Sequence, residues 1–128
     1  MFAARSLLFV PGSRADRFAK ARASGAGLIV IDCEDAVSAE EKPAARTAAL
    51  AEVAANPDWL AIRINGVATA AGVADLAALA EAAQLPRVLL VPMVEAADEL
   101  RIVTAALGPR CPELVPLIET PRGLRHAL

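Results

Sequence analysis

Acidic residues, one arginine and one asparagine follow the short apolar runs of this sequence, at the point where each run ends. They are Asp32, Glu34 and Asp35 after one run, Arg63 and Asn65 after the next, Glu95 after a further one, and Glu119 after the last. Crowded carboxylates repel one another unless a cation lies among them. Mg²⁺ suits such oxygen ligands, and arginine binds a carboxylate through paired hydrogen bonds. A metal ion beside an arginine could bind a 2-oxo acid and stabilise its enolate.

The same residues also have a purely structural interpretation. Aspartate and glutamate at strand ends often cap the next helix, and Arg63 could simply pair with Asp32. Each residue taken alone favours this interpretation, whereas the set together favours a site. The alternation of side chains along a strand predicts that Asp32 and Glu34 share one side, with Cys33 opposite, and that Arg63 and Asn65 share a side.

Apolar runs alternate with alanine-rich segments along the whole chain. The runs predict strands over 6–10, 28–32, 59–65, 88–91 and 114–119, and the alanine-rich segments predict helices over 13–23, 39–55, 73–83, 96–107 and from 121 onward. Ser13 and Asp16 fit an N-cap and its partner. This alternation predicts an α/β fold with a parallel sheet covered by helices. The carboxyl ends of parallel strands form the active face of such folds, so the polar residues should converge there.

The strand spacing indicates which parallel fold is formed. Strand starts near 6, 27, 59, 87 and 113 lie about 27 residues apart, so eight units would need roughly 214 residues, as in a TIM-type (β/α)₈ barrel. This chain holds about five of those eight βα units. An open, doubly wound five-stranded sheet remains the alternative, because the pattern alone does not choose between them.

Composition excludes several functional classes. The chain has 128 residues and a net charge of −2, with only 3% aromatic residues, which argues against nucleic-acid binding. A 56% hydrophobic content excludes disorder, and no run is long enough for a membrane helix. Cys33 and Cys111 are predicted to be free thiols in a reducing cytosol. No signal peptide is visible, so we expect a cytoplasmic protein.

Two further features carry weaker signals. Pro11-Gly12-Ser13-Arg14 lies at a strand-to-helix turn that could present N–H groups to a phosphate, but ordinary turn chemistry is the favoured interpretation. His126 has no visible partner and is expected at the surface or packed against the fold.

Five segments, taken together and in order, resemble the citrate lyase β-subunit family within the HpcH/HpaI aldolase superfamily. They are Arg5–Gly12 (RSLLFVPG), Asp32–Val37 (DCEDAV), Lys42–Arg46 (KPAAR), Ile62–Asn65 (IRIN) and Leu117–Gly123 (LIETPRG). The resemblance implies a (β/α)₈ barrel assembled into trimers, hexamers or a lyase complex. It also implies Mg²⁺-dependent cleavage of citryl, citramalyl or malyl thioesters, carried on coenzyme A or a carrier protein, into an oxo acid and an acyl thioester.

The resemblance also implies roles for individual residues. By this resemblance, Glu119 corresponds to a metal ligand, and Arg63 corresponds to the residue that binds the oxo-acid carboxylate. Glu34 and Asp35 correspond to acidic groups beside the metal. Parts of the substrate pocket correspond to Pro11, Gly12 and Asn65. Two features depart from the family. Met93 stands where the family usually has lysine, and the family's second metal ligand, an aspartate, lies about a strand and a helix beyond Glu119.

We therefore expect residues 1–128 to be the N-terminal portion of a single barrel lyase domain, with poor solubility or self-association if they stand alone. Two alternatives remain. The first is a 4-hydroxy-2-oxo-acid aldolase of the same superfamily, although the thioester-type segments Arg5–Gly12 and Asp32–Val37 argue against it. The second is a non-catalytic fragment or assembly partner, which Met93 and the early end favour.

Overall fold

A computed structural model describes residues 4–128 of the chain. Its strands are β1 (Leu7–Pro11), β2 (Leu28–Asp32), β3 (Leu60–Arg63), β4 (Val88–Val91) and β5 (Glu113–Pro116). Its α-helices are α1 (Phe18–Arg22), α2 (Lys42–Ala55), α3 (Ala70–Glu81), α4 (Ala97–Leu107) and α5 (Pro121–Ala127). Short 3₁₀ turns are η1 (Ala15–Arg17), η2 (Ala39–Glu41), η3 (Pro57–Trp59) and η4 (Gly108–Arg110).

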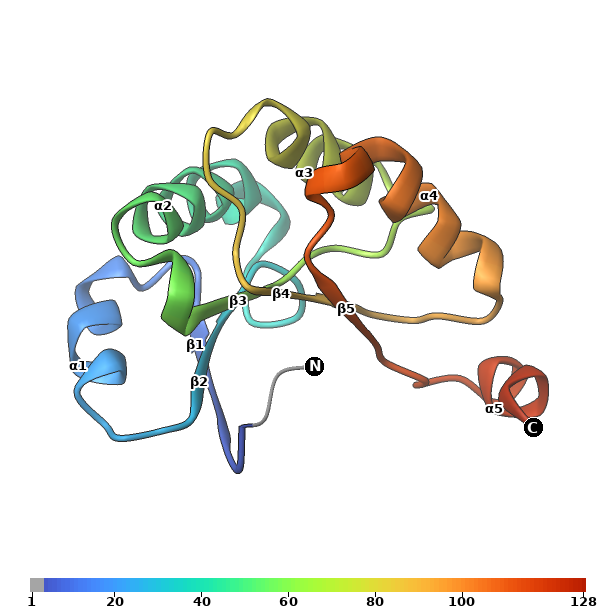
Figure 1. Ribbon diagram of the computed structural model, residues 1–128, viewed down its shortest axis with the longest axis horizontal. Helices are drawn as coiled ribbons and strands as arrows, with labels where there is room; N and C mark the ends of the chain where they lie inside the picture. The colour runs from blue at the N-terminus through green and yellow to red at the C-terminus, as the bar shows by residue number, and fades with distance from the viewer. Residues whose placement is uncertain (1–3) are drawn as a thin grey trace.

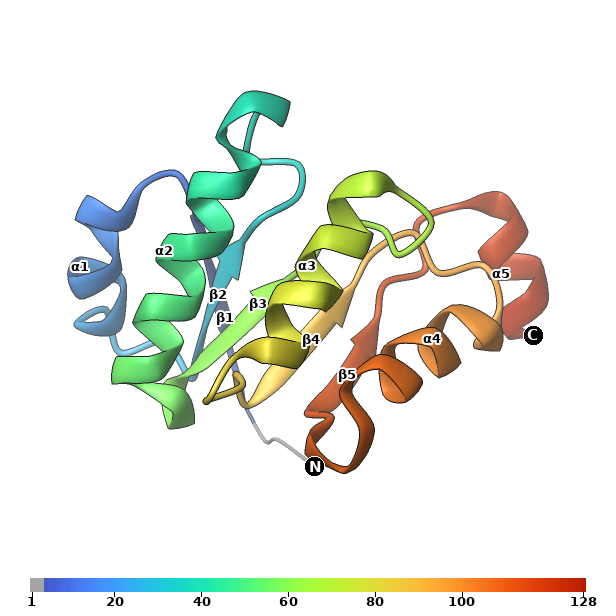
Figure 2. The same cartoon turned by 90° about the horizontal axis from the view of Figure 1, so that it is seen from above.

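The strands form one parallel sheet in which each strand pairs with the next in sequence. The order is β1-β2-β3-β4-β5, with no change of direction along the sheet. The sheet curves, and helices α1 to α4 lie along its outer side (Figures 1 and 2). A doubly wound sheet would reverse its strand order and carry helices on both faces. The structure therefore confirms the barrel-type βα repeat, which within residues 4–128 is not closed.

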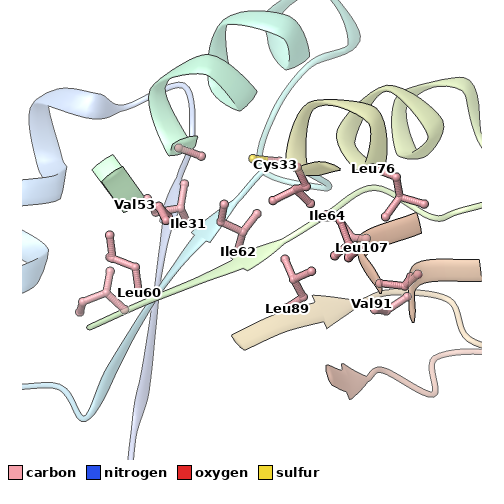
Figure 3. Close-up of a cluster of buried hydrophobic side chains, with 14 of the residues drawn as sticks. Ile31, Cys33, Val53, Leu60, Ile62, Ile64, Leu76, Leu89, Val91 and Leu107 are labelled. Atoms are coloured by element: carbon pink, nitrogen blue, oxygen red, sulfur yellow. The ribbon is translucent and has the colours of Figure 1, made fainter. Parts of the chain in front are cut away.

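The main hydrophobic core lies between the sheet and these helices. The sheet contributes Ile31, Leu60, Ile62, Ile64, Leu89 and Val91, and the helices contribute Val53, Leu76 and Leu107, among others (Figure 3). Val53 and Ile31 are fully buried. The apolar runs of the sequence therefore bury one face of every central strand against helices, as parallel sheets require.

Alternate residues of the same strands form a second, smaller cluster on the inner side of the curved sheet. It contains Leu28, Val30, Ala61, Val88 and Leu90, with Ala4, Val115 and Leu117 packed against it. Residues one position apart thus belong to opposite faces, and both faces of the central strands are buried. By this alternation, Asp32 and Arg63 continue the inner side of β2 and β3 toward the carboxyl ends.

The outer edges of the sheet are less well covered. Leu7, Leu8 and Phe9 on β1 are 38–45% exposed, although all belong to an apolar strand. Beyond β5, Ile118 is 42% exposed. Exposed apolar side chains on unpaired strand edges favour association between chains. This arrangement therefore supports the prediction of self-association.

The element boundaries differ from the sequence expectations at two helix starts. Ser13 does not cap the first helix, because Arg14 occupies the N-cap position and pairs with Asp16 instead. The third helix begins at Ala70, not at residue 73, because the Thr69 hydroxyl accepts a hydrogen bond from the Gly72 N–H. Among the described residues no helix is both long and apolar enough to cross a membrane.

Both cysteines are free, and they should differ strongly in reactivity. Cys33 is buried, and desolvation raises the pKa of its thiol to about 12. Cys111 is only partly buried. In the native protein at pH 8 we expect Cys111 to react with a disulfide reagent, and Cys33 to react only as the chain unfolds, because a protonated buried thiol is a poor nucleophile. The Cys111→Ser variant, in which Cys33 is the remaining cysteine, is treated with the reagent in native buffer and in urea, and the rate of thiol modification is measured. Rapid modification of Cys33 in native buffer would contradict the prediction.

Candidate functional site

Arg63, the last residue of β3, is the centre of the candidate site. The parallel register places it beside Asp32, the last residue of β2. Its Nε and Nη2 atoms donate to the Asp32 Oδ1 and Oδ2 atoms at 2.8 and 2.6 Å. The Arg63 side chain is 13% exposed and that of Asp32 is 3% exposed. This bidentate geometry is the strong form of an arginine–carboxylate pair, and it fixes the plane of the guanidinium.

Asp32 has its acceptors fully engaged in holding this arrangement. Besides the two Arg63 bonds, its carboxylate accepts from the Glu34 N–H at 2.9 Å and the Ala36 N–H at 3.3 Å. Burial alone would raise the pKa of Asp32, but the Arg63 and backbone hydrogen bonds outweigh it and hold the pKa below its ordinary value. The structural interpretation weighed from the sequence is therefore confirmed for Asp32, which is an anchor for Arg63.

The other end of the guanidinium faces the loop after β2. Arg63 Nη1 lies 3.0 Å from Glu34 Oε2 and 3.6 Å from Asp35 Oδ2. The Phe9 ring lies below the guanidinium, with its centroid 5.4 Å from Cζ. Glu34 Oε2 is buried without an aligned hydrogen bond, whereas the Asp35 side chain is 77% exposed. The fold thus brings Arg63, Glu34 and Asp35 together, as the sequence predicts.

Glu34 is an acid whose environment disfavours its charge. Burial raises the pKa of Glu34 above its ordinary value. Arg63 opposes this effect, whereas the negative charges of Asp35, Glu119 and Asp32 reinforce it. A buried carboxyl with a raised pKa among like charges is a typical property of functional sites.

Glu34→Gln is expected to raise the free energy of unfolding at pH 7, by about 1 kcal/mol. The pKa of Glu34 is higher in the folded chain than in the unfolded chain, so folding disfavours the ionised form. The gain should shrink as pH falls through the raised pKa and vanish below pH ~4, where both states are protonated. Urea unfolding of both proteins from pH 4 to 8 measures this, and a destabilised variant at pH 7 would contradict it.

Glu119 lies beyond the carboxyl end of β5, and its side chain reaches the loop after β4. Its Oε2 atom accepts from the Met93 N–H at 3.1 Å. Met93 has a φ of 56°, a left-handed conformation that costs about 1 kcal/mol for a residue with a side chain. Glu119 itself is exposed. Met93 therefore contributes its backbone N–H to this face, while the residue is 48% exposed.

Metal ligands gather only in part. Among residues 4–128, no three His, Cys, Asp or Glu side chains are close enough to form a metal site. Glu119 lies near enough to Glu34 for its negative charge to raise the pKa of Glu34. Their oxygens are the donor type that Mg²⁺ prefers, and Mg²⁺ commonly takes one or two protein carboxylates with the rest from water and substrate. The donor chemistry of these two carboxylates fits Mg²⁺, and Glu119 is the more exposed of the two.

Asn65 has different partners from the substrate contact that the sequence predicts. It is 4% exposed, and its Nδ2 atom donates to the Cys33 carbonyl at 2.9 Å and to Asp75 Oδ2 at 2.8 Å. β3 ends at Arg63, so strand alternation no longer sets the direction of Asn65. These bonds lie within the packing of β2, β3 and α3, and we interpret Asn65 as a residue that positions the strand ends.

The backbone polar groups of the Pro11–Gly12 turn are hydrogen-bonded to other backbone groups of the chain. The Gly12 N–H donates to the Asp32 carbonyl at 2.8 Å, and the Pro11 carbonyl accepts from the Arg14 N–H at 2.9 Å. A Cβ at Gly12 would lie 3.0 Å from the Ala45 Cβ, so glycine allows β1 to approach α2. These bonds agree with ordinary turn chemistry. The turn nevertheless borders the same face as Asp32.

Other predicted polar positions connect loops. Glu95 accepts from the Thr120 hydroxyl at 2.9 Å, and its carbonyl contacts His126 Nδ1 at 2.8 Å. His126 is exposed, as expected. Sequence reasoning missed Asp75, a 3% exposed carboxylate in α3. The available signal is one acid inside an otherwise apolar helix, which must find a partner because buried charges are paired.

These features define a class of protein: a parallel βα fold of the barrel type with an arginine anchored among acidic residues at the carboxyl ends of its strands. This chain belongs to the HpcH/HpaI aldolase/citrate lyase family, whose model matches residues 5–113.

Individual relatives agree with this family. A citrate lyase subunit beta-like protein of Mycobacterium tuberculosis is 39% identical over 116 residues, which cover 91% of this chain and 39% of the relative. A (3S)-malyl-CoA thioesterase of Cereibacter sphaeroides is 39% identical over 126 residues, covering 96% of this chain and 43% of the relative.

A crystal structure of the M. tuberculosis protein CitE with magnesium, acetoacetate and coenzyme A superposes with a TM-score of 0.82 at 36% identity. The match covers 99% of this chain and 44% of that protein. The chain thus spans less than half the length of these relatives.

Proposed function

We propose that this chain carries part of the active site of a Mg²⁺-dependent carbon–carbon lyase. The substrate is a hydroxy-acyl thioester of the citryl, citramalyl or malyl type, and the products are an oxo acid and an acyl thioester. The observation that carries the proposal is Arg63, whose guanidinium is fixed by Asp32 and points its Nη1 atom toward the acidic loop. Residues 1–128 would form the N-terminal portion of a single (β/α)₈ barrel domain.

Arg63 has one edge left for substrate. Asp32 occupies the Nε and Nη2 edge, so a carboxylate of the oxo-acid portion would bind along Nη1 and the second Nη2 proton. Because Asp32 holds the guanidinium plane in advance, the ligand need not order a flexible side chain. Glu34 and Asp35 lie near Nη1, so an incoming anion has to displace or rearrange them.

Glu119 is the proposed Mg²⁺ ligand on this chain. When bound, Mg²⁺ would supply positive charge that stabilises the hydroxyl oxygen of the substrate as it loses its proton. It would also offset the repulsion among Glu119, Glu34 and Asp35 that raises the pKa of Glu34. The relative solved with magnesium and acetoacetate supports this choice of metal and ligand class.

Cleavage of the carbon–carbon bond requires a proton acceptor. The hydroxyl group loses its proton as its carbon becomes the carbonyl of the oxo acid. The adjacent carbon–carbon bond breaks, and its electron pair moves to the carbon beside the thioester, which then takes up a proton. Glu34 is the candidate for this exchange, because its carboxylate lies 3.0 Å from Arg63 Nη1, where the oxo-acid portion would bind, and because burial raises its pKa. Asp35 adds negative charge beside it.

The thioester portion would lie near β1. A groove of about 690 Å³ beside this strand is lined by Phe9, Pro11, Arg17 and Lys20, among others. Apolar walls with two cations suit a thioester arm that carries phosphates, as coenzyme A does. The names of the relatives, which include a malyl-CoA enzyme, favour coenzyme A over a carrier protein. Homo-oligomers such as trimers or hexamers are part of the same proposal.

Calorimetry tests the Mg²⁺ and oxo-acid part of the proposal. Oxaloacetate, pyruvate and glyoxylate are titrated into the chain with and without Mg²⁺. We expect binding that requires Mg²⁺ and weakens about tenfold or more in Glu119→Gln. Glu81→Gln, a change at an exposed glutamate of α3, is the matched control and should bind as the wild type does.

Incubation with malyl-CoA and citramalyl-CoA tests the reaction class. Oxo acid released with acyl-CoA supports a lyase, and free thiol with malate or citramalate indicates a thioesterase. Condensation of pyruvate with an aldehyde would favour the 4-hydroxy-2-oxo-acid aldolase. A folded chain that binds none of the three oxo acids with Mg²⁺ would support the non-catalytic fragment or assembly partner.

A further inference from the structure

Two cations one helical turn apart on α2 are directed toward the candidate site. Lys42 Nζ donates to the carbonyls of Cys33 at 3.1 Å and Glu34 at 2.9 Å. Arg46 donates from Nε to Asp75 Oδ1 at 2.7 Å. Both side chains are partly buried, whereas surface cations usually remain in water. Neither contact is needed to begin or end α2, so the bonds serve the neighbouring loops.

Lys42 fixes the peptide that carries Glu34. The Cys33 carbonyl accepts from Lys42 and also from Asn65 Nδ2, and the Cys33 N–H donates to the Arg63 carbonyl at 3.0 Å. The Glu34 carbonyl accepts from Lys42, and the Glu34 N–H donates to Asp32. The backbone polar groups on both sides of the Glu34 Cα therefore have partners, and the direction of its side chain follows from them.

Arg46 reaches the end of β3 through Asp75. Asp75 Oδ2 accepts from both the Asn65 N–H and Asn65 Nδ2 at 2.8 Å. Asn65 in turn donates to the Cys33 carbonyl, which is also bonded to Lys42. The two cations thus act on one connected set of hydrogen bonds that spans the ends of β2 and β3, next to the Glu34–Arg63 contact.

We propose that Lys42 is a positioning residue, which holds Glu34 against Arg63 through the Cys33 and Glu34 carbonyls. Its consequence for ligand binding rests on the function proposed above, whereas its effect on the position of Glu34 does not. Lys42 touches neither the Arg63 side chain nor the proposed metal ligand, so its effect on a ligand passes through the Cys33–Glu34 segment that it holds. Loss of such supporting contacts commonly lowers affinity about tenfold or more.

Lys42→Met removes the donor group and keeps a side chain of similar shape. We expect the affinity for the oxo acid with Mg²⁺ to fall about tenfold, and Lys42→Arg, which keeps donors, to recover part of it. In a Glu34→Gln background the effect of Lys42→Met should drop below about twofold, because the positioned group is already changed. Arg87 is an exposed cation next to the start of β4, at the opposite end of the sheet from Glu34, and Arg87→Met is the matched control for loss of charge.

A readout without ligand separates this inference from the proposed function. In ¹⁵N-labelled protein, the Arg63 Nε–H and Glu34 amide resonances should shift in Lys42→Met and remain in place in Arg87→Met. Equal effects of Lys42→Met in the wild-type and Glu34→Gln backgrounds would overturn the inference, as would unchanged resonances in a folded variant. If the wild type binds no oxo acid, the proposed function fails, and the resonances still decide the role of Lys42. If Lys42→Met does not fold, Lys42→Arg is compared with the wild type instead. Because Lys42→Arg keeps hydrogen-bond donors, a shifted Arg63 Nε–H resonance in that variant would overturn the inference.

Discussion

Arg63→Met abolishes oxo-acid binding and destabilises the fold: we expect both losses from this one change. The variant leaves Asp32, whose side chain is 3% exposed, without its cationic partner. Removing one partner of a buried ion pair typically costs about 3 kcal/mol. Affinity for an oxo acid should fall about 100-fold or more, because paired charge-assisted hydrogen bonds are lost. Urea unfolding and calorimetry measure the two effects separately.

A second variant distinguishes the loss of stability from the loss of the site. Adding Asp32→Asn to Arg63→Met removes the unpaired charge and keeps one side-chain acceptor, the Asn Oδ1 atom, for the closer of the two N–H groups, that of Glu34. This double variant should regain part of the lost free energy of unfolding while still binding no oxo acid. Oxo-acid binding by the stable double variant would show that Arg63 is only structural. Unchanged stability in Arg63→Met would contradict the proposed anchoring role of Asp32.

Gly72→Ala is expected to lower the free energy of unfolding by about 3 kcal/mol, since a Cβ there has no space. It would lie 2.1 Å from the Gly66 carbonyl oxygen and 2.9 Å from the Asn65 carbonyl oxygen. Both neighbours are backbone atoms, so the first turn of α3 would have to move away from the end of β3. Glycine-to-alanine changes inside helices usually stabilise by up to about 1 kcal/mol, so the expected effect has the opposite sign.

Gly66→Ala provides the matched control for this prediction. Its Cβ would meet only the Thr69 Cγ2 atom, at 3.8 Å, an ordinary van der Waals contact. We expect its free energy of unfolding to lie within about 0.5 kcal/mol of the wild type. Equal stability of Gly72→Ala and Gly66→Ala in urea would refute the close approach of α3 to the β3 end.

The sequence predicts the fold more completely than its helix boundaries. Apolar runs such as Leu28–Asp32 are strands because both of their faces are buried, and this pattern is visible without coordinates. The alanine-rich pattern predicts a helix from residue 73, whereas α3 begins at Ala70. The earlier start depends on the Thr69 cap and on the contact of Gly72 with Gly66, and a close approach between segments leaves no mark in a periodic pattern.

The relative placement of the candidate site residues follows from the sequence where strand geometry applies, and not beyond it. Asp32 and Arg63 end neighbouring parallel strands, so their meeting follows from the register. Asn65 lies past the end of β3, where side chains no longer alternate, and its direction depends on Asp75 in α3. Lys42 belongs to a recognised segment, but the carbonyls that it contacts become visible only once α2 packs against the loop after β2.

The order of pairing along the sheet also bears on how the chain folds during its synthesis. Every strand from β2 onward pairs with the strand made immediately before it. A strand that leaves the ribosome therefore meets a partner already present, and loop closure spans a single helix and its turns. Among the five strands within residues 4–128, none has to be inserted between two others. Such a chain can grow by adding one strand and one helix at the β5 edge, without breaking any earlier pair.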